Sequence, residues 1–329
     1  MADEWVPDIL GKGFEQLTLP LGVDGLAGPL VATLVRSIPN PALAWTKPLG
    51  DVDVLYVHGW SDYFFQTELA HFWTARGARF HALDLRRYGR SIREGQTRGY
   101  VDSLDEYDTD IEAALQAMGH GADAGERKRK LVLLGHSTGG LTLTLWAARH
   151  PGRAQAVVLN SPWLEFQIGA VGRHVVAPLV GMRARVDPRG TNPQVDFGYY
   201  TRAQTEIGSL PVDGYREEWR PERGFATNPG WLEAVLRGHR QISKGVDVGC
   251  PALVLLSAHS ASPLSWTDAA TRADSVLVVD DIARMATKIG KLVTIGRIDG
   301  AIHDIFLSRA EPREEAYRVL DIWVRATLR

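Results

Sequence analysis

Short runs of apolar, often β-branched residues alternate along the chain with longer segments in which apolar positions recur every three or four residues. The short runs predict strands, and the longer segments predict helices. Regular alternation of this kind is typical of a mainly parallel sheet with helices on both faces, so we expect an eight-stranded α/β fold. The predicted strands are residues 14–19, 30–36, 52–58, 79–85, 130–134, 156–160, 252–257 and 291–297, and the predicted helices are residues 62–77, 100–118, 139–150, 229–244, 280–289 and 311–327.

The alternation changes at two places. The first two predicted strands have no helix between them, so we expect that edge of the sheet to be antiparallel. Between residues 161 and 227 the alternation stops, and the segment is rich in Pro, Gly, Arg and aromatic residues. A loop of this length without structure of its own is uncommon in a compact domain. We therefore expect an inserted cap at 163–228, which divides the core of the fold into residues 1–162 and 229–329.

The strand predicted at residues 130–134 runs into the sequence Gly-His-Ser-Thr-Gly-Gly, and an apolar helical pattern follows at once. A G-x-S-x-G sequence between a strand and a helix predicts a sharp turn that presents the hydroxyl of Ser137 at the tip of the sheet, where the strand ends. A side chain at Gly135 or Gly139 would collide with the neighbouring turn or strand, and Gly140 allows the helix to begin close to the sheet. The structural alternative is a serine that only caps the helix, which would need neither of the flanking glycines.

A serine becomes a nucleophile when a base accepts its proton and a third group orients that base. His303 follows the last predicted strand, and active groups gather at the carboxyl ends of strands in such sheets. We expect His303 to be the base, against the alternative of a loop histidine that bonds to water. For the acid we favour Asp274, with Asp268 in reserve. Asp280 and Asp281 stand at the start of a predicted helix, where a capping role explains them.

An oxyanion hole needs two oriented N–H donors. One is the backbone N–H of Thr138, at the start of a predicted helix, and the other is that of Trp60, which follows a buried strand ending in His-Gly. Gly59 permits a tight turn there, and we expect His58 to hold this loop by hydrogen bonding rather than to act as a base. His136, inside the G-x-S-x-G turn, is expected to pack rather than to catalyse.

Taken together, these segments resemble the α/β-hydrolase superfamily, in the group of serine aminopeptidases and monoacylglycerol lipase-like (lysophospholipase-like) proteins. The resemblance covers about residues 14–162 and 229–329 and implies the hydrolase fold, but it does not specify a substrate. In such relatives the acid directly follows the seventh strand, whereas Asp274 lies at the end of a longer loop. The cap carries no motif of a known specificity. The matching segments are His58-Gly59-Trp60, residues 83–91, residues 135–140, residues 157–162 and the loop that carries His303.

Composition excludes several classes of protein and of site. The 329 residues carry a formal net charge of −2, so there is no broad basic field for nucleic acid or an anionic membrane. A single cysteine, Cys250, excludes an intrachain disulfide and multi-cysteine metal sites, and it fits a reducing compartment. No signal peptide is visible, and the apolar runs are too short to span a membrane. We expect a cytoplasmic protein without cofactor, metal, nucleic-acid partner or stable membrane insertion. The sequence does not indicate an oligomeric state.

The cap predicts the kind of substrate. Trp163 and Phe166 begin a run of apolar residues that would line a mostly apolar, acyl-binding pocket above Ser137, although the same residues would equally serve to pack the cap onto the core. The other apolar positions of the run are Ile168, Val171, Val175, Val176, Leu179 and Val180. We expect the substrates to be carboxylic esters with short to medium acyl chains, or monoacylglycerol-like esters.

Other functions share much of this chemistry. An amidase or peptidase, a thioesterase and a carbon–carbon bond hydrolase would use the same three residues, and an acyltransferase would differ only in how its cap excludes water. A non-catalytic binding protein with this fold would lack or displace one of the three. Haloalkane dehalogenases and epoxide hydrolases are disfavoured, because an aspartate replaces the serine of the turn in those relatives.

Overall fold

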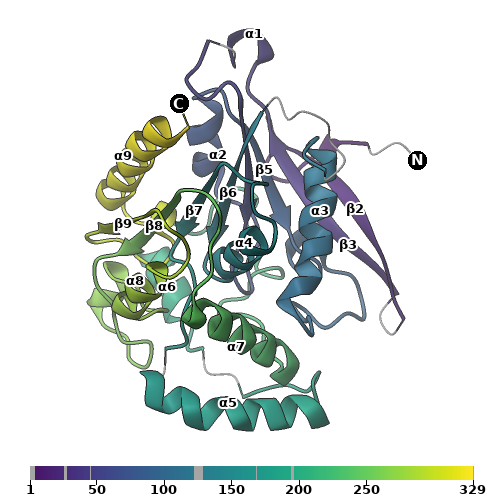
Figure 1. Ribbon diagram of the computed structural model, residues 1–329, viewed down its shortest axis with the longest axis vertical. Coiled ribbons are helices and arrows are strands. Elements are labelled where there is room, and N and C mark those ends of the chain that lie inside the picture. Colours follow the sequence, from purple (N-terminus) through teal and green to yellow (C-terminus); the bar gives the residue numbers. More distant parts are fainter. Residues whose placement is uncertain are drawn as a thin grey trace.

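A sheet of nine strands forms the centre of the computed structural model, which describes residues 4–25, 28–44, 46–121, 129–167, 169–193 and 196–328 (Figure 1). The strands lie in the order β1-β2-β3-β5-β4-β6-β7-β8-β9. Their bounds are β1 Val6–Pro7, β2 Glu15–Asp24, β3 Gly28–Ser37, β4 Val52–Val57, β5 Arg79–Asp84, β6 Lys130–His136, β7 Ala156–Asn160, β8 Ala252–Ser257 and β9 Val293–Ile298.

The sheet is antiparallel at one edge and parallel over the rest. Strands β1, β2, β3 and β5 pair antiparallel in turn, whereas every pairing from β5 through β4 to β9 is parallel. The predicted α/β fold and its antiparallel edge are therefore confirmed. The predicted number of strands is one too low. The additional strand β1 has only two residues, which pair with Gln16 and Glu15, and two residues are too few to show a periodicity.

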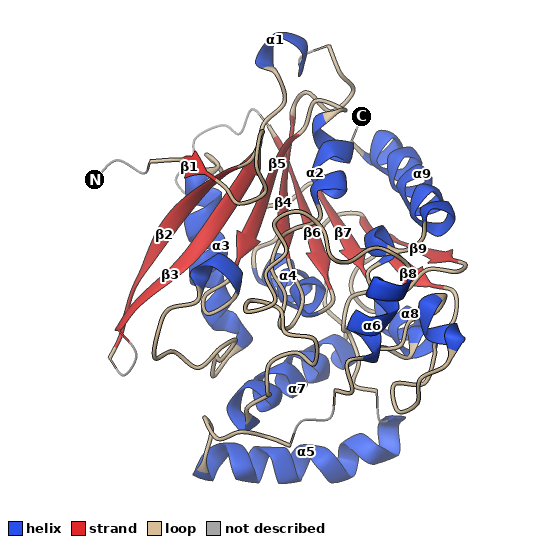
Figure 2. Ribbon diagram, turned by 180° about the vertical axis from the view of Figure 1, so that it is seen from behind, coloured by secondary structure: helices blue, strands red, loops and turns tan. Residues whose placement is uncertain are grey.

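Helices cover both faces of the sheet (Figures 1 and 2). Successive residues of β4 point to opposite faces: Leu55 and Val57 join the core under α3, α4, α7 and α8, while Val54 and Tyr56 join the core under α2 and α9. Every residue of β4 is buried, as expected of a parallel strand covered on both sides. The helix bounds are α1 Pro41–Ala44, α2 Thr67–Thr74, α3 Tyr107–Ala117, α4 Thr138–Arg149, α5 Gly169–Val186, α6 Tyr199–Glu206, α7 Pro229–Lys244, α8 Val279–Ala286 and α9 Ala310–Thr327.

Two predicted helices begin later than the sequence pattern suggested. The helix predicted at 62–77 begins at Thr67, because the residues before it form a loop whose Phe64 N–H donates to the buried carboxylate of Asp84. The helix predicted at 100–118 begins with a 3-10 turn, Leu104–Glu106, in which Ser103 and Glu106 form a capping box. Side chains that bond the backbone thus decide where these helices start.

Helices α5 and α6 belong to the segment between β7 and α7. Helix α5 packs against α7 rather than against the sheet, and α6 contacts the 3-10 turn Asp268–Thr271 (Figure 1). Ile168 and the side chains of Val171, Val175 and Val176, which the sequence assigned to the apolar run, lie outside the described residues. Of the same run, Leu179 is 58% exposed, so its side chain does not contribute to a buried face.

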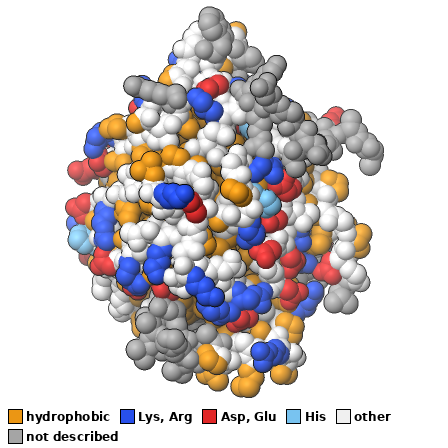
Figure 3. Space-filling view, viewed as in Figure 1, with side chains coloured by type: hydrophobic (Ala, Val, Ile, Leu, Met, Phe, Trp, Pro, Cys, Tyr) orange, Lys and Arg blue, Asp and Glu red, His pale blue; other side chains and the backbone are white. Residues whose placement is uncertain are grey.

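On the face seen in Figure 3, acidic and basic side chains are interspersed among neutral and apolar ones, in keeping with the small net charge. Over the described ranges, none of the helices combines the length and the apolar character needed to cross a bilayer.

Candidate active site

The turn between β6 and α4 holds Ser137 in an unusual backbone conformation. Its φ is 51° and its ψ is −117°, a region that costs a residue other than glycine about 1–3 kcal/mol. Two neighbouring bonds hold the turn: the Ser137 N–H donates to the Asn160 carbonyl (3.1 Å), and the Ser137 carbonyl accepts from the Trp163 N–H (2.9 Å). The serine therefore stands at the carboxyl end of the sheet, where it lines a pocket.

Three glycines around the turn permit its close packing, as the sequence indicated. A Cβ on Gly135 would lie 2.6 Å from the Cα of Gly140, and a Cβ on Gly139 would lie 2.3 Å from the His58 carbonyl oxygen. A Cβ on Gly140 would lie 2.7 Å from the Pro162 Cβ. Each of these distances is too short for a real contact, so a side chain at any of the three positions would push the turn away from its neighbours.

His303 and Asp274 are brought together by the structure. The Nδ1 atom of His303 lies 2.8 Å from Oδ2 of Asp274, and because a carboxylate only accepts, Nδ1 is the donor. The other carboxylate oxygen of Asp274 accepts the N–H groups of Val276 and Leu277, both at 2.8 Å. The Asp274 side chain is fully buried, so these three donors compensate for its lost hydration. The reserve candidate Asp268 is itself exposed and begins the 3-10 turn Asp268–Thr271, away from His303.

The long loop after β8 returns to the strand it left. Asp274 forms a parallel bridge with Ser260, just beyond the end of β8. Its N–H donates to the His259 carbonyl (3.0 Å), and its carbonyl accepts from the Ala261 N–H (2.7 Å). Asp274 thus lies beside the end of β8 in space although it follows that strand distantly in sequence. This bridge brings Asp274 to the end of the strand, where the resemblance implies an acid.

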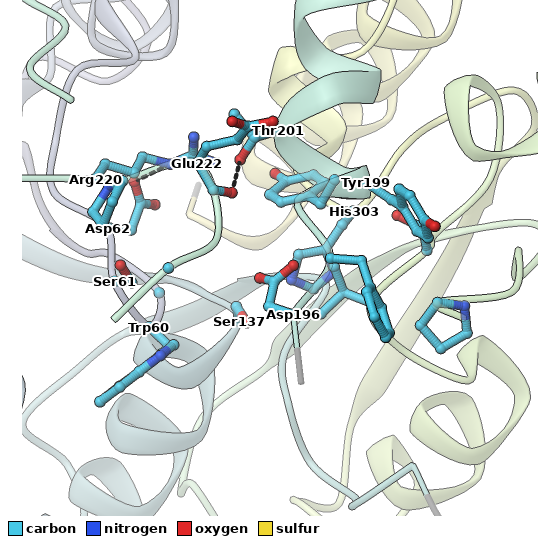
Figure 4. Close-up of a pocket in the computed structure, with 18 of the residues that line it drawn as sticks. Trp60, Ser61, Asp62, Ser137, Asp196, Tyr199, Thr201, Arg220, Glu222 and His303 are labelled. Atoms are coloured by element: carbon cyan, nitrogen blue, oxygen red, sulfur yellow. Dashed lines mark hydrogen bonds and ion pairs between the residues drawn. The ribbon is translucent and has the colours of Figure 1, made fainter. Parts of the chain in front are cut away.

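The imidazole of His303 lies among other rings and lines the pocket (Figure 4). Its centroid is 5.0 Å from that of His136, and Tyr200 of α6 contacts it edge to face at 5.4 Å. The ring is 3% exposed and faces the same pocket as Ser137. Burial lowers the pKa of His136, whose Nδ1–H donates to the Asn160 carbonyl (3.1 Å). His136 therefore packs as a neutral ring.

The loop after β4 runs alongside the serine. A Cβ on Gly59 would lie 3.0 Å from the Ser137 Cβ, so the backbone that leads to Trp60 lies next to the nucleophile candidate. His58 holds this loop: its Nε2 accepts the Leu85 N–H (3.1 Å), which leaves Nδ1–H to donate to the Gly59 carbonyl (2.7 Å). Burial lowers the pKa of His58 and keeps the ring neutral.

One oxyanion candidate follows Ser137 in the chain, and the other lines the same pocket as Ser137. Thr138 is the next residue and the first of α4, so its N–H belongs to a helix N-terminus. Trp60 lines the pocket that Ser137 and His303 share. The placement of both residues is compatible with the roles that the sequence suggested for their N–H groups.

The pocket has a volume of about 240 Å³ and lies between the ends of the strands and the segment that contains α6 (Figure 4). Neither Trp163 nor Phe166 is among the described residues that line it. Their rings stack on one another at 5.8 Å, and both pack against His239 of α7. The aromatic and apolar groups that line the pocket are instead Trp60, Phe197, Tyr199, Tyr200, Pro221, Pro263 and Val276.

Sequence reasoning missed two groups of buried polar residues near the site. Asn160 donates to Asp304 (2.7 Å) and accepts from the Ile305 N–H (3.2 Å), so it ties the end of β7 to the loop of His303. Asp62 and Arg220 form an ion pair in the wall of the pocket. A polar residue at the carboxyl end of a buried strand is a signal that could have found Asn160. The pairing of Asp62 with Arg220 is a tertiary contact and cannot be predicted from a single sequence.

The described part of the chain contains no cluster of three or more His, Cys, Asp or Glu side chains placed to hold a metal ion.

Comparison with known families agrees with this geometry. Residues 51–309, more than three quarters of the chain, match the family model described as serine aminopeptidase, S33. The chain belongs to this family. The resemblance inferred from the G-x-S-x-G turn, the His-Gly-Trp segment and the loop that carries His303 is thereby confirmed. The match begins just before β4 and ends just after the loop that carries His303, so it includes all three residues proposed for the chemistry.

Other proteins of known sequence or structure align with part or nearly all of this S33 family member. The (lyso)-N-acylphosphatidylethanolamine lipases of Homo sapiens and Bos taurus are each 34% identical over 83 residues, which are 25% of the chain and 22% of the relative. The match thus spans about a fifth of the length of these relatives. A soluble variant of the monoglyceride lipase of Saccharomyces cerevisiae has a TM-score of 0.65 at 14% identity, over 98% of this chain and 97% of its own. The monoacylglycerol lipase of Paleococcus ferrophilus has a TM-score of 0.57 at 20% identity, over 84% and 94%. At these identities the structures show a shared α/β-hydrolase fold.

Proposed function

We propose that this protein is a serine hydrolase that cleaves carboxylic esters, with Ser137 as nucleophile, His303 as base and Asp274 as the orienting acid. The observation that carries the proposal is the bond between His303 and Asp274 beside the pocket that contains Ser137. The serine, the imidazole and the buried carboxylate match the roles that acyl transfer requires. Several similar proteins are named as lipases, which supports an ester substrate rather than another acyl compound.

The chemistry follows from the hydrogen-bond pattern. Since Nδ1 of His303 carries a hydrogen toward Asp274, Nε2 holds a lone pair that accepts the proton of the Ser137 hydroxyl. The serine oxygen attacks the ester carbonyl, and the N–H groups of Trp60 and Thr138 stabilise the oxyanion that forms. The imidazolium then protonates the leaving alcohol as the carbon–oxygen bond breaks. Water repeats the sequence on the acyl-enzyme, which releases the carboxylic acid and restores the serine.

The size and lining of the pocket support short to medium acyl chains. Its volume of about 240 Å³ is below the range of roughly 300–1,000 Å³ that is usual for ligand pockets. Trp60, Phe197 and Val276 supply apolar surface against which such a chain would be buried. A monoacylglycerol-like ester with a short acyl chain fits the same description. The single cysteine of the chain supports a cytoplasmic location, which stays a prediction.

The first test asks whether Ser137 is an activated nucleophile. We expect a fluorophosphonate probe to label the wild-type protein and not the Ser137→Ala variant. Ser262→Ala, which changes a serine in the loop after β8 outside the pocket lining, is the matched control and should label like the wild type. Absence of label on the wild type would favour a binding protein with the hydrolase fold.

The second test defines the substrate. A series of p-nitrophenyl esters from acetate to palmitate should give the highest kcat/KM at short to medium chains. Aminoacyl p-nitroanilides and acyl thioesters of matched chain length form the comparison set, because an amidase or a thioesterase would use the same three residues. Faster turnover of either class than of every ester would replace the ester assignment and leave the nucleophile unchanged.

A further inference from the structure

The loop that carries the Trp60 N–H is held from the cap side by an ion pair. We define the oxyanion loop as residues 60–62. Asp62 and Arg220 are each 6% exposed, and the Nε of Arg220 lies 3.1 Å from Oδ1 of Asp62. Figure 4 shows the two side chains facing one another in the wall of the pocket. Arg220 belongs to the segment between α6 and α7, so this contact joins the cap to the core.

A second contact from the same segment holds the oxyanion loop. The Phe225 N–H donates to Oγ of Ser61 at 2.9 Å. Ser61 is 4% exposed and has a φ of 51°, a conformation that persists only when the surroundings hold it. The ring of Phe225 packs edge to face on Trp60, with centroids 6.1 Å apart. Each of the three residues of the oxyanion loop is therefore in contact with segment 220–225.

Arg220 also connects to the loop of the proposed base. Its Nη2 donates to Oε1 of Gln204 (2.7 Å), and the amide of Gln204 donates to the hydroxyl of Tyr200 (3.0 Å). That hydroxyl accepts the N–H of Asp304 (3.2 Å), the residue after His303. A single guanidinium thus links the oxyanion loop on one side to the histidine loop on the other.

The ion pair is needed because Asp62 is buried. Burial raises the pKa of Asp62, and the charge of Arg220 opposes that rise. If the guanidinium were absent, the carboxylate would be left without a counter-charge in a nearly dry site, and the loop would have to move or take up a proton. The Trp60 N–H lies two residues away, and an oxyanion donor is effective only within about 2.7–3.1 Å of the charge. A small movement of the loop is therefore enough to impair it.

We propose that Arg220 is a positioning residue that holds the oxyanion loop, through Asp62, in the geometry that stabilises the transition state. The inference rests on the proposed function. It makes the cap more than a cover for the pocket, because the core presents a competent oxyanion hole only when segment 220–225 is in place. Arg220 acts through Asp62 and does not need to touch the substrate.

Three variants test the proposal: Arg220→Gln, Arg220→Lys, and the double variant Asp62→Asn/Arg220→Gln, in which no buried charge is left unpaired. The readouts are kcat and KM on a short p-nitrophenyl ester, and the affinity for phenylboronic acid, which forms a tetrahedral adduct with the serine. We expect Arg220→Gln to lower kcat about 10- to 100-fold with little change in KM, and to weaken boronate binding in parallel. Arg220→Lys should recover part of the loss, because it restores the charge without the planar fork.

The double variant separates positioning from stability. Its amide pair leaves no unpaired buried charge and should fold, but it lacks the ion pair that holds Asp62 against Arg220, so its kcat should still be reduced, by up to as much as in the single Arg220→Gln variant. Arg79→Gln is the matched control, since Arg79 pairs with the fully buried Asp53 at the opposite end of the parallel strands. It should lower the free energy of unfolding and leave kcat unchanged.

The outcomes distinguish this inference from the proposed function. If the wild type hydrolyses the ester and the folded Arg220→Gln and double variants match it in kcat and boronate affinity, Arg220 does not position the loop. If the wild type neither hydrolyses esters nor reacts with the fluorophosphonate probe, it is the proposed function that fails. A fall in melting temperature without a fall in kcat would also overturn the positioning role.

Discussion

At the scale of single residues, the proposed site depends on groups whose orientation is fixed before any substrate arrives. Asp274 accepts two backbone N–H groups with one oxygen and the imidazole of His303 with the other. Its carboxylate cannot rotate without losing all three bonds. His303 is thereby kept in the tautomer that leaves Nε2 free to accept a proton, which is the property that a general base requires.

Asp274→Asn tests this orientation directly. The amide oxygen can still accept the N–H groups of Val276 and Leu277, so its NH₂ group is left facing Nδ1 of His303. The imidazole must then accept at Nδ1 and carry its hydrogen on Nε2, which is the wrong tautomer for a base. We expect kcat for a short p-nitrophenyl ester to fall about 10³- to 10⁴-fold with a nearly unchanged melting temperature.

Asp268→Asn is the control for this change. It alters an exposed aspartate of the same loop that lies outside the site, and its kcat should equal that of the wild type. Equal activity of Asp274→Asn and the wild type would show that the carboxylate does not orient the base.

At the scale of elements, the ends of the parallel strands carry the groups that hold the site together. Asn160 ends β7, where its carbonyl accepts the N–H of Ser137 and its side chain bonds to Asp304 and Ile305. Gln66, just before α2, donates to the second carboxylate oxygen of Asp304 at 3.1 Å. The serine turn, the histidine loop and the start of α2 are therefore joined through one buried amide and one buried carboxylate.

Asn160→Asp would place a second carboxylate against Asp304 in a buried site. The Asn160 Nδ2 lies 2.7 Å from Asp304 Oδ1, and two carboxylates at that distance cannot both ionise. The shared proton would be lost as the pH rises, and the histidine loop would then be pushed away from the serine turn. We expect kcat at about pH 8 to fall at least tenfold, and to recover toward the wild-type value as the pH is lowered and the pair regains its proton.

Asn228→Asp is the matched comparison for this pH profile. Asn228 is also buried, at the start of α7, and it donates to the carbonyls of Arg189 and Gly190 instead of a carboxylate. This variant should lose stability and keep the pH dependence of the wild type. A flat profile for Asn160→Asp would mean that the Asn160–Asp304 contact does not place His303.

The strands were largely predictable because each is a sharply bounded apolar run. Strands β7 and β8 and helix α7 have the same bounds as predicted, since each begins or ends at a proline, a polar residue or a glycine. Helix α2 was predicted to begin too early, because the apolar residues Tyr63, Phe64 and Phe65 continue its pattern although they belong to a loop. The pattern of apolar positions depends on which residues are buried. A buried loop with several aromatic residues close together therefore gives the same sequence pattern as a helix. The division of the chain into core and cap stays a prediction.

Only those residues of the site that are marked by their neighbours in the sequence could be predicted. Ser137 stood out through its glycines, and His303 through its position after the last strand. Asp274 could be preferred over its neighbours but not argued from spacing, because the Ser260 bridge that returns it to β8 is a tertiary contact. Trp163 and Phe166 were chosen as substrate contacts for their apolar character, which served equally well to pack them against α7. Apolar character alone does not distinguish a pocket from a core.

At the scale of the whole molecule, polar groups are buried at both ends of the sheet, and they have different consequences. The carboxyl ends of the strands carry the proposed site. The opposite end carries Asp53, where β4 begins, with Arg79, Arg129 and His120 bonded to its carboxylate. His81 of β5 is buried nearby and is affected by the charges of this group. None of these residues lines the pocket, so they concern the stability of the fold and its dependence on pH.

His81 predicts how the stability of the molecule depends on pH. Burial lowers the pKa of His81 to about 3. The charge of Asp53 opposes this shift, and Arg79, Arg36 and His120 add to it. The unfolded chain binds a proton at this histidine below about pH 6.5 and the folded chain does not, so stability present above that pH is lost as the pH falls toward 3.

His81→Leu tests this pH dependence. The Nδ1 atom of His81 has no hydrogen-bond partner among the described residues, which makes the substitution a mild change. We expect urea unfolding to show that the free energy of unfolding falls between about pH 7.5 and about pH 5 by up to about 2 kcal/mol more in the wild type than in His81→Leu. The reason is that each pH unit below 6.5 contributes about 1.4 kcal/mol. Comparing the two proteins at about pH 7.5 removes the packing cost of the substitution, and equal losses in both would show that His81 is protonated in the folded state as readily as in the unfolded chain.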